Sequence, residues 1–305
     1  MQIDIKSINY LENLDFFAKQ VVEGFITGLH KSPFHGFSVE FAEHRIYNQG
    51  ESIRNVDWKL YARTDKMFIK RFVEETNLRC HLVIDSSSSM FFPFNKKNSL
   101  DKLTFSILSS ACLMNLFVRQ RDAFGVTMFS ESLDFHRNPK ASKKHYFQLI
   151  YELENMLKKK RKTSIKTDFS KSINSLVDLV KERSLIIIFS DFQGSEETLD
   201  SLFQSIQNLK YNKHEVILFH ISDFNFEKNL DFSRGFYKFI DLETNKEINL
   251  NPIEIKKKFQ LENDILNSLI KEKASQNKTD YYLADINVGF NQMLKSYLIK
   301  RSKLY

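Results

Sequence analysis

The stretch SLIIIFSD at residues 184–191 is an unbroken run of apolar, mostly β-branched side chains that ends in a Ser-Asp pair. A central strand of a parallel sheet is covered by helices on both faces, so both of its sides are apolar. The run therefore predicts a buried central strand. A second run, RCHLVID at residues 79–85, reads the same way and also ends at an acid, Asp85.

Around these two runs, short apolar segments alternate with longer amphipathic ones. Strands predicted at 214–223 and 280–286 are preceded by helical patterns at 196–209 and from about 253. This alternation predicts a doubly wound α/β fold, with a mainly parallel sheet and helices on both faces. We expect this domain at residues 79–305, and a helical and β appendage at residues 1–78.

Composition is that of an ordinary soluble globular protein, with 42% hydrophobic and 27% charged residues among 305. The first residues lack the basic and apolar regions of a secretory signal. The most apolar long window, 103–118, contains several polar residues and is shorter than the roughly 20 residues of a membrane span. We therefore expect no membrane span and a cytoplasmic location.

Five oxygen-bearing side chains are expected to meet at one edge of the sheet. Asp85 ends one predicted strand, and Ser87 and Ser89 follow it; Asp191 ends the other, and Thr167 opens the helix that leads into it. The carboxyl ends of parallel strands share one edge, where ligands gather. Hydroxyls and carboxylates suit hard cations such as Mg²⁺ or Mn²⁺. The alternative is that each of these residues is an ordinary helix cap.

The order Asp-x-Ser-x-Ser, a distant Thr and a strand-terminal Asp resembles the metal-ion-dependent adhesion site of von Willebrand factor A domains. The resemblance implies that Ser87, Ser89 and Thr167 ligate a divalent cation directly, while Asp85 and Asp191 hold it mainly through waters. Mg²⁺ is the expected ion, with Mn²⁺ and Ca²⁺ as alternatives. An open coordination position would accept a carboxylate of a partner protein.

The segment EFAEHRIYNQGESIRNVDWKLYARTDKMFIKRFVEE at residues 40–75, with LVIDSSSSM shortly after it, resembles the bacterial family called domain of unknown function 58. That family is a von Willebrand A-like group whose members are associated with MoxR-type AAA+ ATPases. The resemblance implies a chaperone-like or substrate-presenting adaptor. Its signature residues either dock the appendage as a buried ion-pair and aromatic cluster or face the ATPase: Arg45, Tyr47, Arg54, Asp57, Trp58 and Arg63.

Two other classes of function compete with the adaptor. A metal-dependent hydrolase could use Asp85 as its nucleophile, but it needs a second acid two residues later, where Ser87 stands. A nucleic-acid-binding protein would explain the net charge of +7.

The basic residues are scattered except for two runs, at 157–166 and 255–259, and the first contains Lys158, Lys159, Lys160, Arg161 and Lys162. This first run has no interleaved aromatic residues of the kind that stack on bases. It is either a solvated helix end or a patch that steers an acidic partner towards the metal site. We therefore expect a non-enzymatic adaptor that does not bind nucleic acid.

Overall fold

The computed structural model describes residues 13–29, 44–46, 58–64, 66–70, 78–93, 100–158, 168–233 and 235–304. The chain divides into two compact units. One consists of Met1–Gly28 with Leu78–Tyr305, and the other of Leu29–Asn77.

The larger unit is built on a six-stranded sheet with the order β10-β7-β6-β3-β4-β5. Its strands are β3 (Arg79–Asp85), β4 (Ala123–Phe129), β5 (Leu133–Lys140), β6 (Leu185–Ser190), β7 (Glu215–Ser222) and β10 (Asp280–Asp285). All neighbouring strands are parallel except β5, which runs antiparallel to β4. The two apolar runs become β3 and β6, which pair at the centre of the sheet, and β6 is buried along its whole length. The predicted mainly parallel α/β sheet is confirmed.

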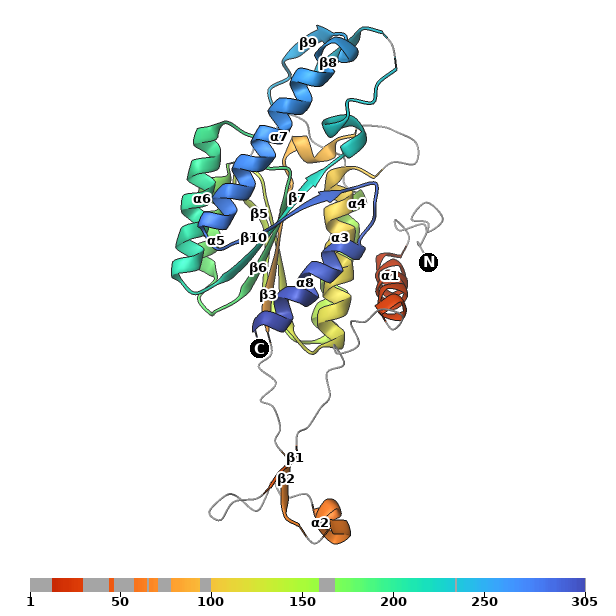
Figure 1. The fold of residues 1–305 in the computed structure, drawn as a ribbon, viewed down its shortest axis with the longest axis vertical. Coiled ribbons are helices and arrows are strands. Elements are labelled where there is room, and N and C mark those ends of the chain that lie inside the picture. Colours follow the sequence, from red (N-terminus) through yellow and green to blue (C-terminus); the bar gives the residue numbers. More distant parts are fainter. Residues whose placement is uncertain are drawn as a thin grey trace. The chain divides into compact units, whose positions relative to one another are not determined.

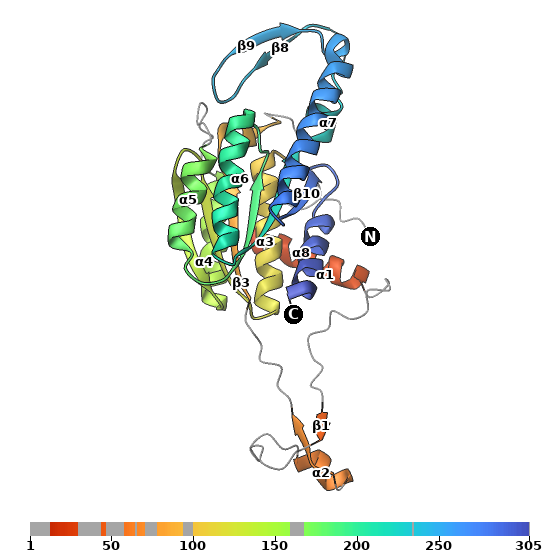
Figure 2. The same ribbon diagram turned by 60° about the vertical axis from the view of Figure 1, so that its left-hand side comes forward.

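Helices cover both faces of the sheet (Figure 1 and Figure 2). One face carries α1 (Leu14–Leu29), α3 (Lys102–Arg119), α4 (Lys143–Lys158) and α8 (Asn291–Leu304). The other carries α5 (Phe169–Leu179), α6 (Glu196–Tyr211) and α7 (Pro252–Gln276). On that second face Ile186 and Ile188 of β6 pack in one apolar core with Phe169 of α5 and Leu202 of α6.

Helix α1 belongs to the larger unit, which differs from the expected boundary at residue 78. Apolar residues recur along it at the spacing of a helix face, and they are buried: Leu14, Phe17, Ala18, Val21 and Val22. The Tyr146 hydroxyl of α4 donates to Asp15 at 2.8 Å, and the ring of Phe17 meets that of Phe290 at 5.6 Å. Burial of this apolar face ties α1 to the sheet domain.

The described part of the smaller unit contains β1 (His44–Ile46), α2 (Trp58–Thr64) and β2 (Phe68–Lys70). Strands β1 and β2 pair antiparallel, with His44 opposite Lys70.

The larger unit also carries two features near the carboxyl edge of the sheet. Ser88–Phe91 forms a 3-10 turn after β3, and Phe224–Lys228 forms a π-helical turn after β7. Strands β8 (Tyr237–Ile240) and β9 (Glu247–Leu250) pair antiparallel as a hairpin.

Candidate functional site

The carboxyl ends of β3 and β6 meet where the chain changes direction across the sheet. After β3 the chain adds β4 and β5 on one side, and then returns to place β6 on the other side of β3. Open α/β sheets bind ligands at such a switch point, outside the strand ends. Ile84 pairs with Phe189, so Asp85 and Ser190 come next in the same register, and Asp191 follows directly.

The turn after β3 brings two serine hydroxyls together. The Oγ atoms of Ser87 and Ser89 are 3.1 Å apart, and the backbone N–H of Ser87 donates to Asp85 Oδ1 at 2.9 Å. Ser87 is buried, whereas Ser89 is half-buried. Neighbouring oxygen ligands of an octahedral Mg²⁺, each at roughly 2.1 Å, lie about 3 Å apart. The two hydroxyls are hydrogen-bonded to each other, and their separation is also compatible with two neighbouring ligands of this ion.

The carboxylate of Asp85 lies in a buried environment with an excess of negative charge. The Ser190 hydroxyl donates to Asp85 Oδ2 at 2.7 Å. Burial, and then the negative charge of Asp191, raise the pKa of Asp85 to about 7. A cation beside this carboxylate would relieve that excess of charge.

Asp191 is held by a lysine that the sequence analysis did not select. Lys102 Nζ lies 2.7 Å from Asp191 Oδ2 and 2.5 Å from Glu227 Oε1. Burial alone would raise the pKa of Asp191, but the ammonium of Lys102 and the hydroxyl of Ser89 outweigh it, so this pKa lies below its ordinary value. The two carboxylates likewise outweigh burial at Lys102 and raise its pKa.

The sequence carries only a weak local sign that Lys102 has an acidic partner, and it does not say which one. Lys102 is the first residue of α3, directly after the N-cap Asp101, whose carboxylate accepts the Thr104 N–H at 2.6 Å. A cation at a helix N-terminus is opposed by the helix dipole, so a lysine there needs an acidic partner nearby. Glu227 lies in the turn after β7, and no local pattern marks it.

Several predicted residues fall outside this cluster. The described part of the chain resumes after Thr167 with Asp168, which was not a predicted ligand; it caps α5 and accepts the Lys171 N–H at 2.9 Å. Of the basic run, Lys158 ends α4 and is exposed. The rest of that run and the predicted hydroxyl ligand of α5 lie outside the described residues, so their roles stay predictions: Lys159, Lys160, Arg161, Lys162 and Thr167.

The signature residues belong to the smaller unit. Arg45 lies in β1, Trp58 begins α2, and Arg63 is exposed in α2. The other three lie outside the described residues: Tyr47, Arg54 and Asp57. Whether the signature residues form an ion-pair cluster or an ATPase-facing surface stays an open prediction.

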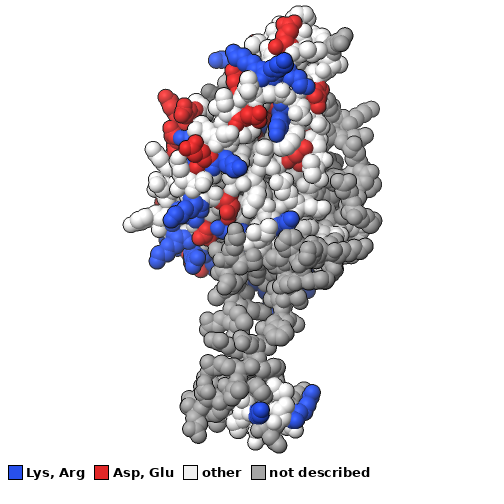
Figure 3. Space-filling view, viewed as in Figure 1, with Lys and Arg blue, Asp and Glu red and all other residues white. Residues whose placement is uncertain are grey.

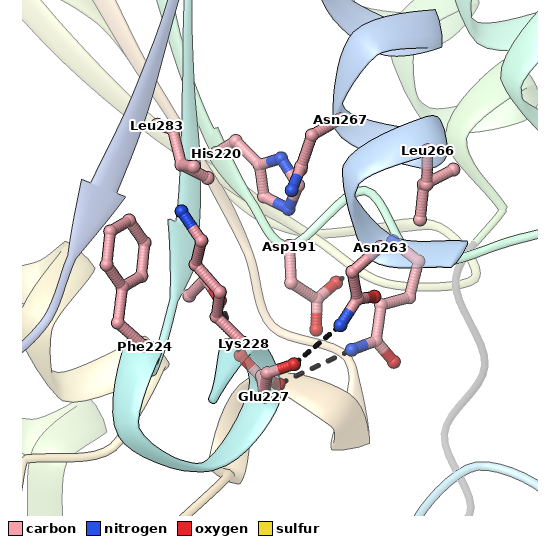
Figure 4. Close-up of a pocket in the computed structure, with 11 residues that line it drawn as sticks. Asp191, His220, Phe224, Glu227, Lys228, Asn263, Leu266, Asn267 and Leu283 are labelled. Atoms are coloured by element: carbon pink, nitrogen blue, oxygen red, sulfur yellow. Dashed lines mark hydrogen bonds between the residues drawn. The ribbon is translucent and has the colours of Figure 1, made fainter. Parts of the chain in front are cut away.

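A small polar cavity of about 50 Å³ lies beside Asp191 (Figure 4). Glu227 and His220 also line it, and Asn263 of α7 donates to the backbone oxygen of Glu227 at 2.6 Å. Burial lowers the pKa of His220 to about 4, so this imidazole is neutral near pH 7. The cavity has room for a few water molecules or one small polar group.

The residues at the switch point fit a hard divalent cation. Two hydroxyls at ligand spacing and two carboxylates are oxygen donors of the kind that Mg²⁺ and Mn²⁺ prefer. Within the described ranges, no group of three or more His, Cys, Asp or Glu side chains could hold a metal ion. A cation at the switch point would therefore depend on serine hydroxyls as well as acids.

Charge on the surface bears on the nucleic-acid alternative. On the described part of the face shown in Figure 3, lysines and arginines are interspersed with aspartates and glutamates. A stripe of one sign is the usual footprint of a nucleic-acid interface. This face therefore lends that alternative no support.

Residues 43–264 match the family described as "Protein of unknown function DUF58". This chain belongs to that family. It is 22% identical over 191 residues to uncharacterized proteins of Mycobacterium bovis and Mycobacterium tuberculosis. The match covers 63% of this chain and spans 59% of the length of those relatives.

Among the similar solved structures are three that share 14% identity with this chain. Conserved hypothetical protein BatB from Bacteroides thetaiotaomicron matches with a TM-score of 0.45, over 74% of this chain and 98% of its own. An aerotolerance-related membrane protein from Bacteroides fragilis matches with a TM-score of 0.43, over 73% and 99%. An uncharacterized membrane spanning protein from Vibrio fischeri matches with a TM-score of 0.22, over 73% and 98%.

These descriptions contradict the expected cytoplasmic location, because two of the three similar structures are named as membrane proteins. The cytoplasmic assignment is therefore withdrawn. Among the described helices, none has the length and apolar character needed to cross a membrane.

Proposed function

We propose that this protein is a non-enzymatic adaptor with a von Willebrand A-like domain. It captures an acidic side chain of a partner protein on a divalent cation held at the switch point between β3 and β6. The observation that carries the proposal is the Ser87–Ser89 hydroxyl pair, 3.1 Å apart, at the same strand ends as Asp85 and Asp191. Helix caps alone would not require two serines and two buried acids to converge.

Each residue has a distinct part in the proposed site. Ser87 and Ser89 offer the direct oxygen ligands, together with Thr167 as the resemblance implies. Asp85 is oriented by Ser190 and by the Ser87 N–H, and it supplies the buried negative charge that favours a cation. Asp191 supplies the second charge from the end of β6 and is oriented by Lys102. When bound, the cation supplies an electrophilic position for a carboxylate oxygen.

The proposed partner is a MoxR-type AAA+ ATPase, its client protein, or both. This part of the proposal depends on the resemblance to the family, whose relatives are associated with such ATPases. An acidic side chain of the ATPase or client would be the group that is captured.

Metal binding is the first test, and the chain offers a matched control. Ser87→Ala removes a proposed ligand. Ser86→Ala removes the neighbouring hydroxyl, which donates elsewhere, to the Phe129 carbonyl and to Asp134, both at 2.8 Å. In calorimetric titrations with Mn²⁺, we expect wild type and Ser86→Ala to bind alike, and Ser87→Ala to bind at least about tenfold more weakly. Absence of binding to folded wild type would overturn the proposed cation site.

Partner capture is the second test. Surface-immobilised protein is exposed to a purified MoxR-type ATPase from the same organism, in Mg²⁺ and in EDTA. Binding that needs both Mg²⁺ and Ser87 supports the adaptor, whereas binding indifferent to both would place the contact elsewhere.

The two alternative functions, a hydrolase and a nucleic-acid-binding protein, are tested on the same protein samples. Phosphate-ester hydrolysis abolished by Asp85→Asn would favour the hydrolase, and oligonucleotide binding with a steep salt dependence would favour nucleic acid.

A further inference from the structure

Lys102 is a charge buried inside the proposed metal site. Its side chain is 0% exposed, and its partner Asp191 is 3% exposed. Glu227, the second partner, is 18% exposed. The ring of Phe92 closes over the ammonium, with its centroid 5.8 Å from Nζ. Burying an ammonium costs several kcal/mol unless carboxylates compensate it, so both contacts are needed to hold Lys102 there.

The two carboxylates differ in what else they contact. Glu227 uses Oε1 for Lys102, while its Oε2 accepts the Ser222 hydroxyl at 3.1 Å and the Asp223 N–H at 2.9 Å. Asp191 uses Oδ2 for Lys102 at 2.7 Å, and a weak contact of 3.4 Å joins its Oδ1 to the Gln193 N–H. Glu227 is thus occupied on both oxygens by Lys102 and two neutral donors, whereas the other partners of Asp191 are the Ser89 hydroxyl and the weakly placed Gln193 N–H.

The contacts among these carboxylates and Lys102 determine the net charge of the site to which a cation would bind. Asp85 and Asp191 repel each other, Asp191 contacts Lys102, and Lys102 contacts Glu227. Three carboxylates and one ammonium therefore leave an excess of two negative charges when all are ionised. A divalent cation matches that excess. Without the ammonium the excess would be three.

We infer that Lys102 is a built-in counter-ion that sets the affinity of the switch-point site for divalent cations. It keeps Asp191 in place without a metal, and it weakens metal binding by placing a fixed positive charge beside the site. Glu227 acts through Lys102 by neutralising part of that charge. This inference rests on the proposed metal site and adds to it a residue outside the Asp-x-Ser-x-Ser pattern.

The test compares two substitutions that change charge in opposite directions. Lys102→Met removes the ammonium and keeps the length of the side chain. Glu227→Gln keeps the shape and removes one negative charge. Mn²⁺ dissociation constants are measured by calorimetry and by electron paramagnetic resonance at one fixed pH. Circular dichroism melts in EDTA check that each variant is folded.

Charge alone predicts the order of affinities. Lys102→Met should bind Mn²⁺ about tenfold more tightly than wild type, and Glu227→Gln about threefold more weakly. The matched control is Lys238→Met, which removes a lysine 2.7 Å from a glutamate at an exposed position, and it should bind as wild type does. A purely structural role for Lys102 would not produce opposite shifts in the two variants.

The outcomes separate this inference from the proposed function. Equal affinities of wild type and the two folded variants would overturn the inference and leave the metal site standing. If Lys102→Met does not fold, an unchanged affinity of Glu227→Gln overturns the inference alone. If folded wild type does not bind Mn²⁺ but Lys102→Met does, the inference about Lys102 is supported and the proposed function is overturned. If neither binds, both are overturned.

Discussion

Four parallel strands of the central sheet end at an aspartate or are followed directly by one, and the two pairs of aspartates differ in their other partners. Asp85 and Asp191, at the ends of β3 and β6, are compensated by groups far away in the chain, Ser190 and Lys102. Asp223 and Asp285, at the ends of β7 and β10, accept hydrogen bonds from neutral groups, some adjacent in the chain and others more than 60 residues away.

The second pair shows what a strand-terminal aspartate does in a purely structural role. Asp223 Oδ1 accepts the Asn225 N–H at 3.0 Å, and Asp285 Oδ1 accepts the Asn287 N–H at 3.0 Å. The amide of Asn287 donates to both carboxylates, at 2.9 and 2.8 Å. Neutral donors suffice at both aspartates here, whereas in the first pair Asp191 contacts a buried ammonium. The partners, rather than the aspartate itself, distinguish a candidate site from a cap.

The largest expected effect is that of removing the ammonium. In EDTA, Lys102→Met leaves the buried Asp191 and the half-buried Glu227 without their cation, and should lower the free energy of unfolding by about 3–5 kcal/mol. Urea denaturation followed by circular dichroism measures this change. A loss below about 1 kcal/mol would show that the ion pair contributes almost nothing to the free energy of unfolding. The two aspartate pairs would then not differ in how much their partners stabilise the fold.

The next effect is the dependence of stability on pH, and it concerns Asp85. Its folded pKa of about 7 lies above the unfolded value of about 3.9, so the folded state binds this proton more tightly. The stability contributed by Asp85 is therefore fully present below about pH 4, is lost as the pH rises to about 7, and is absent above that. The loss should be on the order of 4 kcal/mol in EDTA.

Asp85→Asn supplies the control for this pH dependence. Its carboxamide carries no titrating proton, so the slope between about pH 4 and 7 should flatten, and the variant should exceed metal-free wild type in stability at about pH 8. Mg²⁺ should raise the stability of wild type and not of the variant. A wild-type stability that rises with pH over this window, after subtraction of the variant, would contradict the raised pKa.

The sheet and the first aspartate pair, Asp85 and Asp191, could be predicted from the sequence for physical reasons. β3 and β6 are buried on both faces, so their apolar runs are unbroken and visible. Because parallel strands share one carboxyl edge, Asp85, Ser87, Ser89 and Asp191 could be placed together from their positions at strand ends.

Other parts depend on contacts that no local pattern records. Lys102 meets Asp191 across 89 residues and Glu227 across 125, and a lysine ahead of an apolar helix reads locally as a solvated charge. Helix α1 was grouped with the appendage because it precedes the family signature. Its apolar face is equally compatible with either unit until its packing partners are known.

A smaller effect is expected at the second aspartate pair. Asn287→Ala removes the amide that serves both Asp223 and Asp285, and should cost about 1–2 kcal/mol in urea denaturation. The cost should be the same with Mg²⁺ and with EDTA, because the amide that is lost is neutral and serves aspartates outside the proposed cation site. A cost that Mg²⁺ abolishes would mean that Asp223 and Asp285 also belong to a cation site.

The smallest expected effect is the loss of an exposed ion pair, which separates the contribution of burial from that of ion-pair geometry. Lys238 and Glu247 on the β8–β9 hairpin are 2.7 Å apart, the same separation as Lys102 and Asp191, but their side chains are 53% and 50% exposed. Water solvates both charges when the pair is broken, so Lys238→Met should change the free energy of unfolding by less than about 0.5 kcal/mol. The same measurement on Lys102→Met and Lys238→Met therefore compares two contacts of equal length in different surroundings. Similar losses in the two variants would mean that the length of an ion pair, and not the desolvation of its unpaired acids, determines its contribution in this protein.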